Sequence, residues 1–453
     1  MKAQEIYKSK LKTLDEFLGL IRPRDRICAS IAAGQPRGLL NHLSNKKDLE
    51  ELKIFTGLLA FPYPLFAQPN VQVISGYYGP IDRTLNEMGA NLAYIPLAFP
   101  AFELYAESFN PHAILTTLSS MDQEGYLSFG VDSEAAYLPF LKAARDPNKL
   151  AIAEVNPKMP VVKGLETLGD NRIHISELSA VVEVEQGLLE IPPPEISEVE
   201  KKIAENVAGL VQTGDTLQFG IGGIPNEVAR ILSQSKVEDL GVHSELISDG
   251  FLTLVESGKI TNRAKGLHDG VSLFTFALGS QKLYDWLDER NGRNKRKAVA
   301  APVSYVNDSS VIAQNNRMVA INAGFMIDFS GQVASEAIGE RQYSGVGGQL
   351  NFVQGAFYSP GGRSVLCIKS SVMLDGKRYS NIVDDFPPGT IVSTPRHYAQ
   401  YIVTEYGVVN LYGLTDEERP YELVKIAHPD FRDELKEKAK KRDQVNYKSR
   451  MSR

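Results

Sequence analysis

Two glycine-rich segments in the second half of the chain have the composition of ligand-binding loops. Residues 220–226 (GIGGIPN) lie between a predicted apolar strand and a predicted helix, and residues 345–349 read GVGGQ. Small residues let a backbone approach a bulky ligand closely, and the free N–H groups at a helix N-terminus bind anions. Each segment alone is equally well explained as a tight turn. Together they favour a phosphate-bearing or elongated ligand.

One glutamate lies in a setting that suggests chemistry. Glu245 belongs to residues 241–250 (GVHSELISDG) and sits among apolar residues at a predicted strand or strand end. Such a carboxylate is either exposed on an edge strand or buried as a functional group. Buried acids are costly unless they have partners, and they gather at functional sites. The pattern alone leaves both interpretations open.

Several common motifs are missing from the sequence. Pro225 stands where the third glycine of the dinucleotide fingerprint belongs, and no Gly-Lys-Ser/Thr follows the first loop. The 7 histidines show no HExxH or HxxH spacing, so a zinc site is not expected. There is no GxSxG elbow of the α/β-hydrolase kind. The 2 cysteines, Cys28 and Cys367, are too few for a disulfide framework or a four-cysteine metal site.

Short apolar runs alternate with helical patterns, which predicts an α/β fold with largely parallel sheets. The predicted strands are residues 26–31, 72–75, 113–118, 150–155, 180–184, 216–219, 271–276 and 365–368. The predicted helices are residues 11–21, 226–233, 282–289 and 420–427.

A run of three prolines in residues 189–195 (LEIPPPE) predicts a linker between two domains, residues 1–190 and 191–453. A capping box, Ser197 with Glu200, predicts that a helix restarts directly after it. Each predicted domain starts with an aspartate, a strand, a glycine-containing loop, a proline and an apolar helix. Asp25 precedes Pro36 by nearly the spacing that separates Asp215 from Pro225. This match favours an ancient duplication over chance.

The composition excludes several classes of protein. The 453 residues are 43% hydrophobic and 23% charged, with a formal net charge of −6 and both signs mixed along the chain, so a nucleic-acid binder is not expected. The basic run at residues 290–297 (RNGRNKRK) is interpreted as a solvated loop, with cations for the phosphates of a ligand as the alternative. The polar N-terminus is no signal peptide, and no stretch is long and apolar enough to span a membrane. We therefore expect a soluble, cytoplasmic protein.

Several segments in order along nearly the whole chain resemble the acetyl-CoA hydrolase/transferase family. These stretches are AIAEVNPKMPVV, FGIGGIPNEVARIL, LGVHSELISDG, INAGFMIDFSGQVASEAIG, SGVGGQLNFVQGA, YIVTEYGVVNLYG and IAHPDFRDEL, with a weaker SGYYGPIDR. The chain looks most like the 4-hydroxybutyrate and butyrate:acetate CoA-transferases. The resemblance implies two similar α/β domains of the CoA-transferase type, with the nucleophile and most of the CoA site on the C-terminal domain.

The resemblance also implies roles for individual residues. Glu245 would be the nucleophile, and Asn307 would orient its carboxylate. The CoA site would be lined by Gly220, Ile221, Gly222, Gly223, Ile224, Phe325, Gly347 and Gly348. CoA and acyl-CoA would be substrates, with no tightly bound cofactor and no metal. The departures lie at Asp308-Ser309, at Pro395, His397 and Tyr398, and at Gly34-Gln35. These positions are expected to shape the acid pocket, so the identity of the acid stays open.

The implied chemistry is a ping-pong transfer of CoA to a short-chain carboxylate through a glutamyl-CoA thioester. Two alternatives stay open: an acyl-CoA hydrolase on the same scaffold, in which water intercepts the glutamyl intermediate, and a non-catalytic CoA-binding sensor. A sensor would not need the nucleophile. The base rate among soluble enzymes favours a homodimer.

Overall fold

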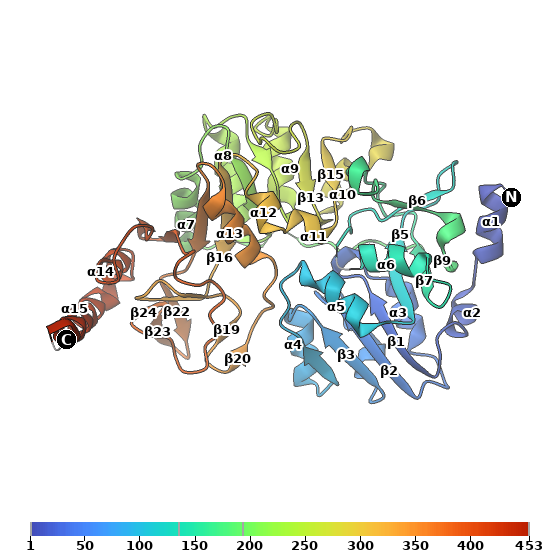
Figure 1. Ribbon diagram of the computed structural model, residues 1–453, viewed down its shortest axis with the longest axis horizontal. Coiled ribbons are helices and arrows are strands. Elements are labelled where there is room, and N and C mark those ends of the chain that lie inside the picture. The colour runs from blue at the N-terminus through green and yellow to red at the C-terminus, as the bar shows by residue number, and fades with distance from the viewer. Residues whose placement is uncertain (1, 135, 193, 452–453) are drawn as a thin grey trace.

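A computed structural model describes residues 2–134, 136–192 and 194–451 of the chain, and it contains two large β-sheets that lie beside each other. In Figure 1 the strands of the first half, in blue and cyan, stand at one end of an elongated molecule. The strands of the second half, in green to orange, lie next to them, and the C-terminal helices project from the far end.

The first sheet has seven strands in the order β4-β3-β2-β1-β5-β7-β9, all parallel. Its strands are β1 (Arg24–Ala29), β2 (Glu51–Thr56), β3 (Val71–Ser75), β4 (Leu92–Tyr94), β5 (Ala113–Leu118), β7 (Leu150–Val155) and β9 (Ala180–Glu183). Alternate side chains of β1 enter different cores: Ile27 and Ala29 join one, and Cys28 joins the other. The carboxyl half of β1, Ile27 to Ala29, is therefore apolar on both faces, as expected for a central strand of a parallel sheet.

Helices cover both faces of this sheet. One core receives side chains from α2 (Leu14–Leu18), α3 (Arg37–Leu43) and α4 (Pro80–Glu87). The other receives side chains from α1 (Ala3–Lys10), α5 (Ala101–Phe109) and α6 (Tyr137–Ala144).

The second sheet has six strands in the order β11-β10-β16-β21-β25-β26. Its strands are β10 (Thr216–Phe219), β11 (Gly241–Val242), β16 (Met318–Ala323), β21 (Arg363–Cys367), β25 (Tyr401–Thr404) and β26 (Gly407–Asn410). All neighbours are parallel except β25 and β26. A parallel bridge from His243 to Leu273 continues the sheet beyond β11 to β13 (Ser272–Phe274) and β15 (Ala298–Ala300).

With this continuation, β15-β13-β11-β10-β16-β21-β25 matches β4-β3-β2-β1-β5-β7-β9 strand for strand in chain order. The shared order is what the predicted duplication requires.

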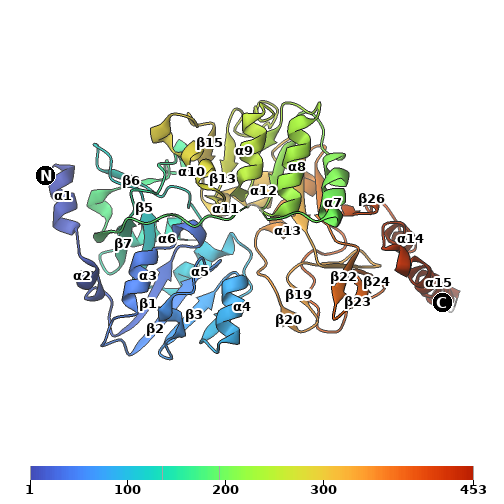
Figure 2. The ribbon, with the colours of Figure 1, turned by 180° about the vertical axis from the view of Figure 1, so that it is seen from behind.

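Helices also cover both faces of the second sheet. One face carries α7 (Glu198–Ala208), α8 (Gly223–Gln234) and α9 (Asp249–Glu256), which stand in front in Figure 2. The opposite face carries α13 (Gln349–Tyr358), which is in front in Figure 1. The remaining helices of four or more residues are η2 (Pro64–Ala67), α10 (Gln281–Leu287), α11 (Val303–Val306), α12 (Ser309–Ile312), α14 (Glu418–Lys425) and α15 (Pro429–Met451).

Short paired strands flank the two sheets. These are β6 (Tyr126–Ser128), β8 (Arg172–His174), β12 (Leu246–Ile247), β14 (Phe276–Ala277), β17 (Met326–Asp328), β18 (Val333–Ala334), β19 (Ala337–Ile338), β20 (Arg341–Gln342), β22 (Ser371–Leu374), β23 (Lys377–Ser380) and β24 (Ile382–Val383). Short 3₁₀ turns complete the list: η1 (Ala32–Gly34), η3 (Glu166–Leu168), η4 (Ile175–Glu177) and η5 (Glu289–Asn291).

The predicted α/β class with largely parallel sheets is confirmed. Three predicted strands have the bounds of β5, β7 and β10, and the predicted capping box of Ser197 and Glu200 begins α7. The predicted helix over residues 11–21 is wrong in extent, because Thr13 caps α2 and the helix ends at Leu18. The single strand predicted over residues 271–276 is also wrong. It is two strands, β13 and β14, which pair with different partners.

Residues 184–197 connect the two sheets, and their described members contain no helix and only one bridge residue, Glu190 opposite Gly279. Pro193, the middle residue of the predicted proline linker, lies outside the described residues. The connection contacts both halves: the Asn156 side-chain amide donates to the Gln186 carbonyl at 2.8 Å, and the hydroxyl of Tyr284 donates to the Leu189 carbonyl at 2.6 Å.

Candidate active site

The predicted functional segments of the second half meet at one edge of its sheet. Residues 220–222 follow β10, the Glu245 segment follows β11 and Phe325 follows β16, and Lys369, which the sequence does not indicate, follows β21 at the same edge. Because these strands are parallel, their carboxyl ends lie at the same edge, where open α/β sheets bind ligands. The Ser248 hydroxyl links two of these loops by donating to the Gly220 carbonyl at 3.4 Å. The Ser244 hydroxyl donates to the Leu246 carbonyl at 2.7 Å, and its oxygen lies 3.4 Å from the Phe219 carbonyl.

The Glu245 carboxylate is held by two donors. The side-chain amide of Asn307 donates to Glu245 Oε2 at 2.6 Å, and the backbone N–H of Gly348 also donates to the carboxylate. Glu245 keeps some solvent contact but is surrounded largely by protein. Burial raises the pKa of Glu245 to about 7, and the bonds from Asn307 and Gly348 act in the opposite direction. The carboxylate is therefore poised between its two protonation states near neutral pH.

A fully buried histidine, His243, bonds to the backbone directly before Asn307. His243 Nδ1 lies 3.0 Å from the Asn315 side-chain amide, and His243 Nε2 lies 2.8 Å from the Val306 carbonyl. Burial lowers the pKa of His243 to about 3, so the ring is neutral and donates from Nε2 to Val306. Val306 directly precedes Asn307, so the ring fixes the backbone that carries the amide. The Oδ1 atom of Asn307 has no hydrogen-bond partner among the described residues.

Gly348 leaves no room for a side chain. A Cβ atom built on it would lie 2.0 Å from Glu245 Oε2 and 2.2 Å from Asn307 Nδ2. Its φ of −98° is open to any residue, so the close approach to the carboxylate, and not the backbone conformation, is what requires glycine here. Gly347 differs, because its φ of +59° is in the left-handed region.

The N-terminal half reaches this site through the segment SGYYGPIDR (75–83). The hydroxyl of Tyr77 lies 3.1 Å from Ser344 Oγ, and Arg83 donates to the Tyr343 carbonyl. A Cβ atom on Gly345 would lie only 2.8 Å from the Cα atom of Tyr77. Phe99 N–H donates to the Gly347 carbonyl at 3.3 Å. The glycine-rich segment 345–348 is therefore clasped between the Glu245 carboxylate and the first half of the chain.

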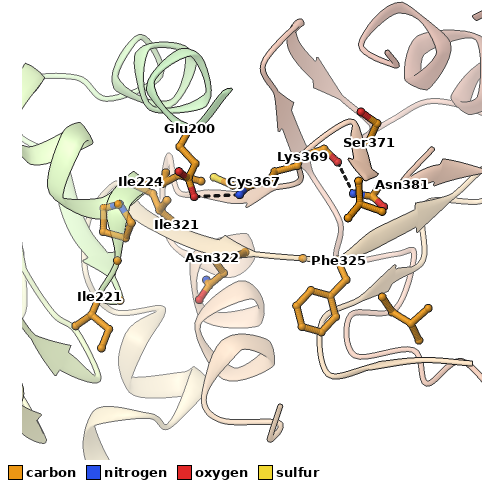
Figure 3. Close-up of a pocket in the computed structure, with 18 residues that line it drawn as sticks. Glu200, Ile221, Ile224, Ile321, Asn322, Phe325, Cys367, Lys369, Ser371 and Asn381 are labelled. Atoms are coloured by element: carbon orange, nitrogen blue, oxygen red, sulfur yellow. Dashed lines mark hydrogen bonds and ion pairs between the residues drawn. The ribbon is translucent and has the colours of Figure 1, made fainter. Parts of the chain in front are cut away.

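A cavity of about 540 Å³ opens at the same sheet edge (Figure 3). Its lining is largely apolar and includes much exposed backbone of the glycine loop. The lining residues are Glu200, Gly220, Ile221, Gly222, Gly223, Ile224, Pro225, Ile321, Asn322, Ala323, Gly324, Phe325, Ile338, Cys367, Lys369, Ser371, Val372 and Asn381. Two of them, Glu200 and Lys369, are charged, and they face each other as an ion pair. A cavity of this size and character accommodates an elongated organic ligand.

The residues singled out from the sequence fall into two adjoining groups. Gly220, Ile221, Gly222, Gly223, Ile224 and Phe325 line the cavity. Glu245, Asn307 and Gly348 are in contact with one another, and Gly347 adjoins them.

Sequence reasoning missed several residues of the site. Tyr77 lies in a segment whose resemblance to the family is weak, and the sequence indicates Glu200 only as part of a helix capping box. Lys369 gave no signal, because a lone lysine after an apolar strand is ordinary. Only the fold places it opposite Glu200.

The basic run at residues 290–297 is exposed at every residue except Asn294, as expected of a solvated loop, and two of its arginines also contact the first half of the chain. Arg290 pairs with Asp288 at 2.7 Å and donates to the Met159 carbonyl. Arg296 pairs with Asp170 and Glu166, each at 3.3 Å. Met159, Asp170 and Glu166 belong to the first half of the chain, so these arginines fasten the two halves together.

No helix within the described residues has the length and apolar character needed to cross a bilayer. Across the same residues there is no group of three or more His, Cys, Asp or Glu side chains suited to hold a metal ion.

Comparison with known proteins places this site in a family context. The profile of the acetyl-CoA hydrolase/transferase N-terminal domain matches residues 1–191, and that of the C-terminal domain matches residues 279–439. The chain is 38% identical over 449 residues to the 4-hydroxybutyrate coenzyme A transferase of Clostridium kluyveri, and the match covers 98% of this chain and 100% of the relative.

Two solved structures are similar over almost the full length. RipA from Yersinia pestis superposes with a TM-score of 0.88 at 34% identity, covering 98% of this chain and 100% of RipA. The 4-hydroxybutyrate CoA-transferase of Porphyromonas gingivalis superposes with a TM-score of 0.77 at 31% identity, covering 97% of this chain and 99% of that structure.

Proposed function

The chain belongs to the acetyl-CoA hydrolase/transferase family, and on that premise we propose that it transfers coenzyme A from an acyl-CoA to a short-chain carboxylate. The observation that carries the proposal is the Glu245 carboxylate, held by Asn307 and Gly348 beside a ligand-sized cavity. The acids we propose are of the acetate, butyrate or 4-hydroxybutyrate type, following the names of the relatives.

The first half of the reaction loads CoA onto the enzyme. A Glu245 oxygen attacks the thioester carbonyl, the C–S bond breaks, and a mixed anhydride and CoA thiolate result. The thiolate then attacks the glutamyl carbonyl of the anhydride. This step forms a glutamyl-CoA thioester and releases the first acid as its carboxylate.

The second half reverses these steps with another acid. Its carboxylate attacks the glutamyl-CoA carbonyl and expels CoA thiolate, which gives a new mixed anhydride. The thiolate attacks the acyl carbonyl of that anhydride, so the new acyl-CoA leaves and the Glu245 carboxylate returns. The scheme consumes no proton or electron overall and uses no tightly bound cofactor.

Each of these attacks passes through a tetrahedral oxyanion. The N–H of Gly348 is directed at the Glu245 carboxyl group, so it is available to the oxyanion that forms when thiolate attacks the glutamyl carbonyl. One preorganised donor of this kind contributes about 3 kcal/mol of transition-state stabilisation. The Asn307 amide, which donates to Oε2, keeps the other carboxyl oxygen in position for attack.

The cavity supports the assignment of CoA as the carrier. Its glycine loop and apolar walls suit a long, flexible ligand, and binding energy gained along that ligand can be used to compress the reacting ends. The proposed CoA contacts are the loop 220–224, Phe325, Gly347 and Gly348. We further propose a two-domain division near residue 190, a homodimer and a cytoplasmic location.

A hydrolase is the second candidate, because the family itself includes acetyl-CoA hydrolases. In that reaction water takes the place of the second acid. An acid that accelerates the loss of the donor acyl-CoA supports transfer, and turnover that is independent of added acid supports hydrolysis.

Trapping of the intermediate tests the nucleophile. The full-length protein is incubated with acetyl-CoA, treated with borohydride and digested, and the peptides are mapped by mass spectrometry. We expect reduction of the thioester at Glu245 to an alcohol, and none in Glu245→Ala, which should lose transfer by a factor of at least about 10³ while still binding CoA. Turnover without any modification at Glu245 would contradict the covalent scheme.

A further inference from the structure

The cavity beside the active site has one positively charged side chain in its lining, and that side chain is already paired with a carboxylate. Lys369 Nζ lies 3.1 Å from Glu200 Oε1, and these are the two charged residues that line the described cavity (Figure 3). The Lys369 side chain is 50% exposed and the Glu200 side chain 22% exposed. An exposed ion pair of this kind is weak, so another anion can displace one partner.

The two oxygens of Glu200 have separate tasks. Oε2 accepts hydrogen bonds from the N–H and the hydroxyl of Ser197, at 2.9 Å and 2.7 Å, and so completes the capping box of α7. Oε1 faces Lys369. Burial opposes ionisation of Glu200, but the bonds from Ser197 and Lys369 outweigh it and lower its pKa. Glu200 therefore stays charged, and Ser197 holds it in place even when Lys369 leaves.

Hydrogen bonds hold the backbone at Lys369, whereas its side chain is half exposed. Its carbonyl accepts a bond from the Asn381 side-chain amide at 2.8 Å. The next residue, Ser370, donates from its N–H and its hydroxyl to the Glu405 carboxylate, at 3.0 Å and 2.6 Å. The backbone is thus fixed at the rim of the cavity, while the half-exposed ammonium group can turn from Glu200 toward a ligand.

We propose that Lys369 binds a phosphate group of CoA and that its ammonium group pairs with Glu200 when CoA is absent. The inference rests on the proposed function, because it assumes that the cavity holds CoA. A phosphate carries more charge and more acceptor oxygens than a carboxylate, and lysine is a common phosphate ligand in proteins. The exchange of partners makes Glu200 a built-in competitor that lowers the affinity for CoA.

Calorimetric titration of CoA into the full-length protein tests both residues. Lys369→Ala should weaken CoA binding about tenfold, because one charge-assisted contact is lost. Glu200→Gln should strengthen binding about threefold, because glutamine still completes a capping box but no longer pairs with the lysine. A gain of affinity cannot come from misfolding, so this variant keeps the test decisive.

The matched controls come from an ion pair outside the cavity. Lys282 and Glu256 lie 2.6 Å apart and are 62% and 49% exposed. Neither Lys282→Ala nor Glu256→Gln should change CoA binding. Acetyl-pantetheine, which has no phosphate, should bind wild type, Lys369→Ala and Glu200→Gln equally.

Dephospho-CoA distinguishes the two kinds of phosphate in CoA. If the effect of Lys369→Ala disappears with dephospho-CoA, the lysine binds the 3′-phosphate, and if the effect persists it binds the pyrophosphate. The proposal is overturned if Lys369→Ala binds CoA like wild type, or if acetyl-pantetheine is weakened equally. Either result leaves transfer intact, whereas failure of the proposed function appears as CoA binding without transfer or hydrolysis.

Discussion

At the scale of single residues, Glu245 combines two opposing requirements. A nucleophile must be ionised, yet a strongly solvated carboxylate attacks poorly. Partial burial removes water from Glu245 and raises its pKa to about 7, while the donors Asn307 and Gly348 keep the ionised form accessible. In the proposed reaction the Gly348 N–H would also serve the later oxyanion, so the site would favour charge at one position throughout.

The raised pKa of Glu245 predicts a pH dependence with a definite sign. Only the ionised carboxylate attacks, so kcat/KM should rise with pH up to about 7 and level off above it. Asn307→Ala removes a bond that lowers this pKa, so its rising limb should move to higher pH and its plateau should fall by roughly 10²-fold. Initial rates with acetyl-CoA and a fixed acid, from pH 5.5 to 8.5 (about the stable range of most enzymes), measure both. A profile that is flat across pH 7 would contradict the assigned ionisation.

Gly348→Ala should disable the reaction without unfolding the protein. Its Cβ atom would lie 2.0 Å from Glu245 Oε2, so the carboxylate must leave its two donors. We expect kcat to fall roughly 10²-fold or more, with the melting temperature little changed. Gly187→Ala is the control, since nothing lies within 4 Å of its Cβ position. Equal activity of Gly348→Ala and wild type would mean that the carboxylate reacts from another position.

The residues of the site could be predicted from the sequence only where a local segment identifies them. Glu245 and Asn307 stand in segments typical of the family, and the structure brings them together. Tyr77, Glu200 and Lys369 depend on contacts between residues more than 150 positions apart, such as the ion pair between Glu200 and Lys369. No local pattern reports such contacts, so the fold had to supply them.

At the scale of elements, the two sheets begin with the same structural device. In each, an aspartate at the start of the first central strand caps the preceding turn. Asp25, the second residue of β1, accepts from the Arg22 N–H at 2.9 Å, and Asp215, directly before β10, accepts from the Gln212 N–H at 2.7 Å. Asp25 also contacts His112 at 2.9 Å. Asp215 pairs with Arg317, which directly precedes β16, and with Arg363, the first residue of β21. In the second sheet this aspartate ties the amino ends of the three adjacent strands β10, β16 and β21, opposite the edge that carries the site.

This device predicts a large loss of stability for Asp215→Ala. The Asp215 side chain is fully buried and Arg363 is 12% exposed, so removal of the carboxylate leaves a buried cation unpaired. We expect the second half to lose about 3 kcal/mol of unfolding free energy. Calorimetric melting measures it, and Glu256→Ala, which breaks an exposed pair with Lys282, should leave the melting temperature almost unchanged. Similar melting of both variants would show that the buried network does not hold the strands.

Strand bounds could be predicted where a strand is buried on both faces. The continuous apolar runs of β5, β7 and β10 have turn residues at their ends, and their predicted bounds agree with the structure. The single strand predicted over residues 271–276 is wrong because its two parts are buried against different partner strands: β13 pairs with β15, and β14 pairs with β12. It breaks at Thr275, whose N–H donates to the Glu245 carbonyl and whose hydroxyl donates to the Ser133 carbonyl. A hydrophobic pattern records burial but not the partner.

At the scale of the whole molecule, the first half of the chain closes the site without supplying its nucleophile. Tyr77 packs on Gly345 and bonds to Ser344, and Phe99 bonds to Gly347. These contacts cover the segment that leads to Gly348 and Glu245. We infer that the first half would shield the proposed glutamyl intermediate from water and would so favour transfer over hydrolysis.

Gly345→Ala tests this shielding because it separates the two halves beside the nucleophile. Its Cβ atom would lie 2.6 Å from Tyr77 Cδ2 and 2.8 Å from Tyr77 Cα, and the backbone contact cannot yield by a rotamer change. We expect acid-independent hydrolysis of acetyl-CoA to rise about tenfold relative to transfer, since water gains access to the glutamyl-CoA thioester. Thiol release with and without added butyrate gives the ratio, and Gly187→Ala should keep the wild-type value. If hydrolysis and transfer fall in proportion in Gly345→Ala, the contact positions the catalytic groups but does not exclude water, and the balance between the two reactions must come from the acid pocket.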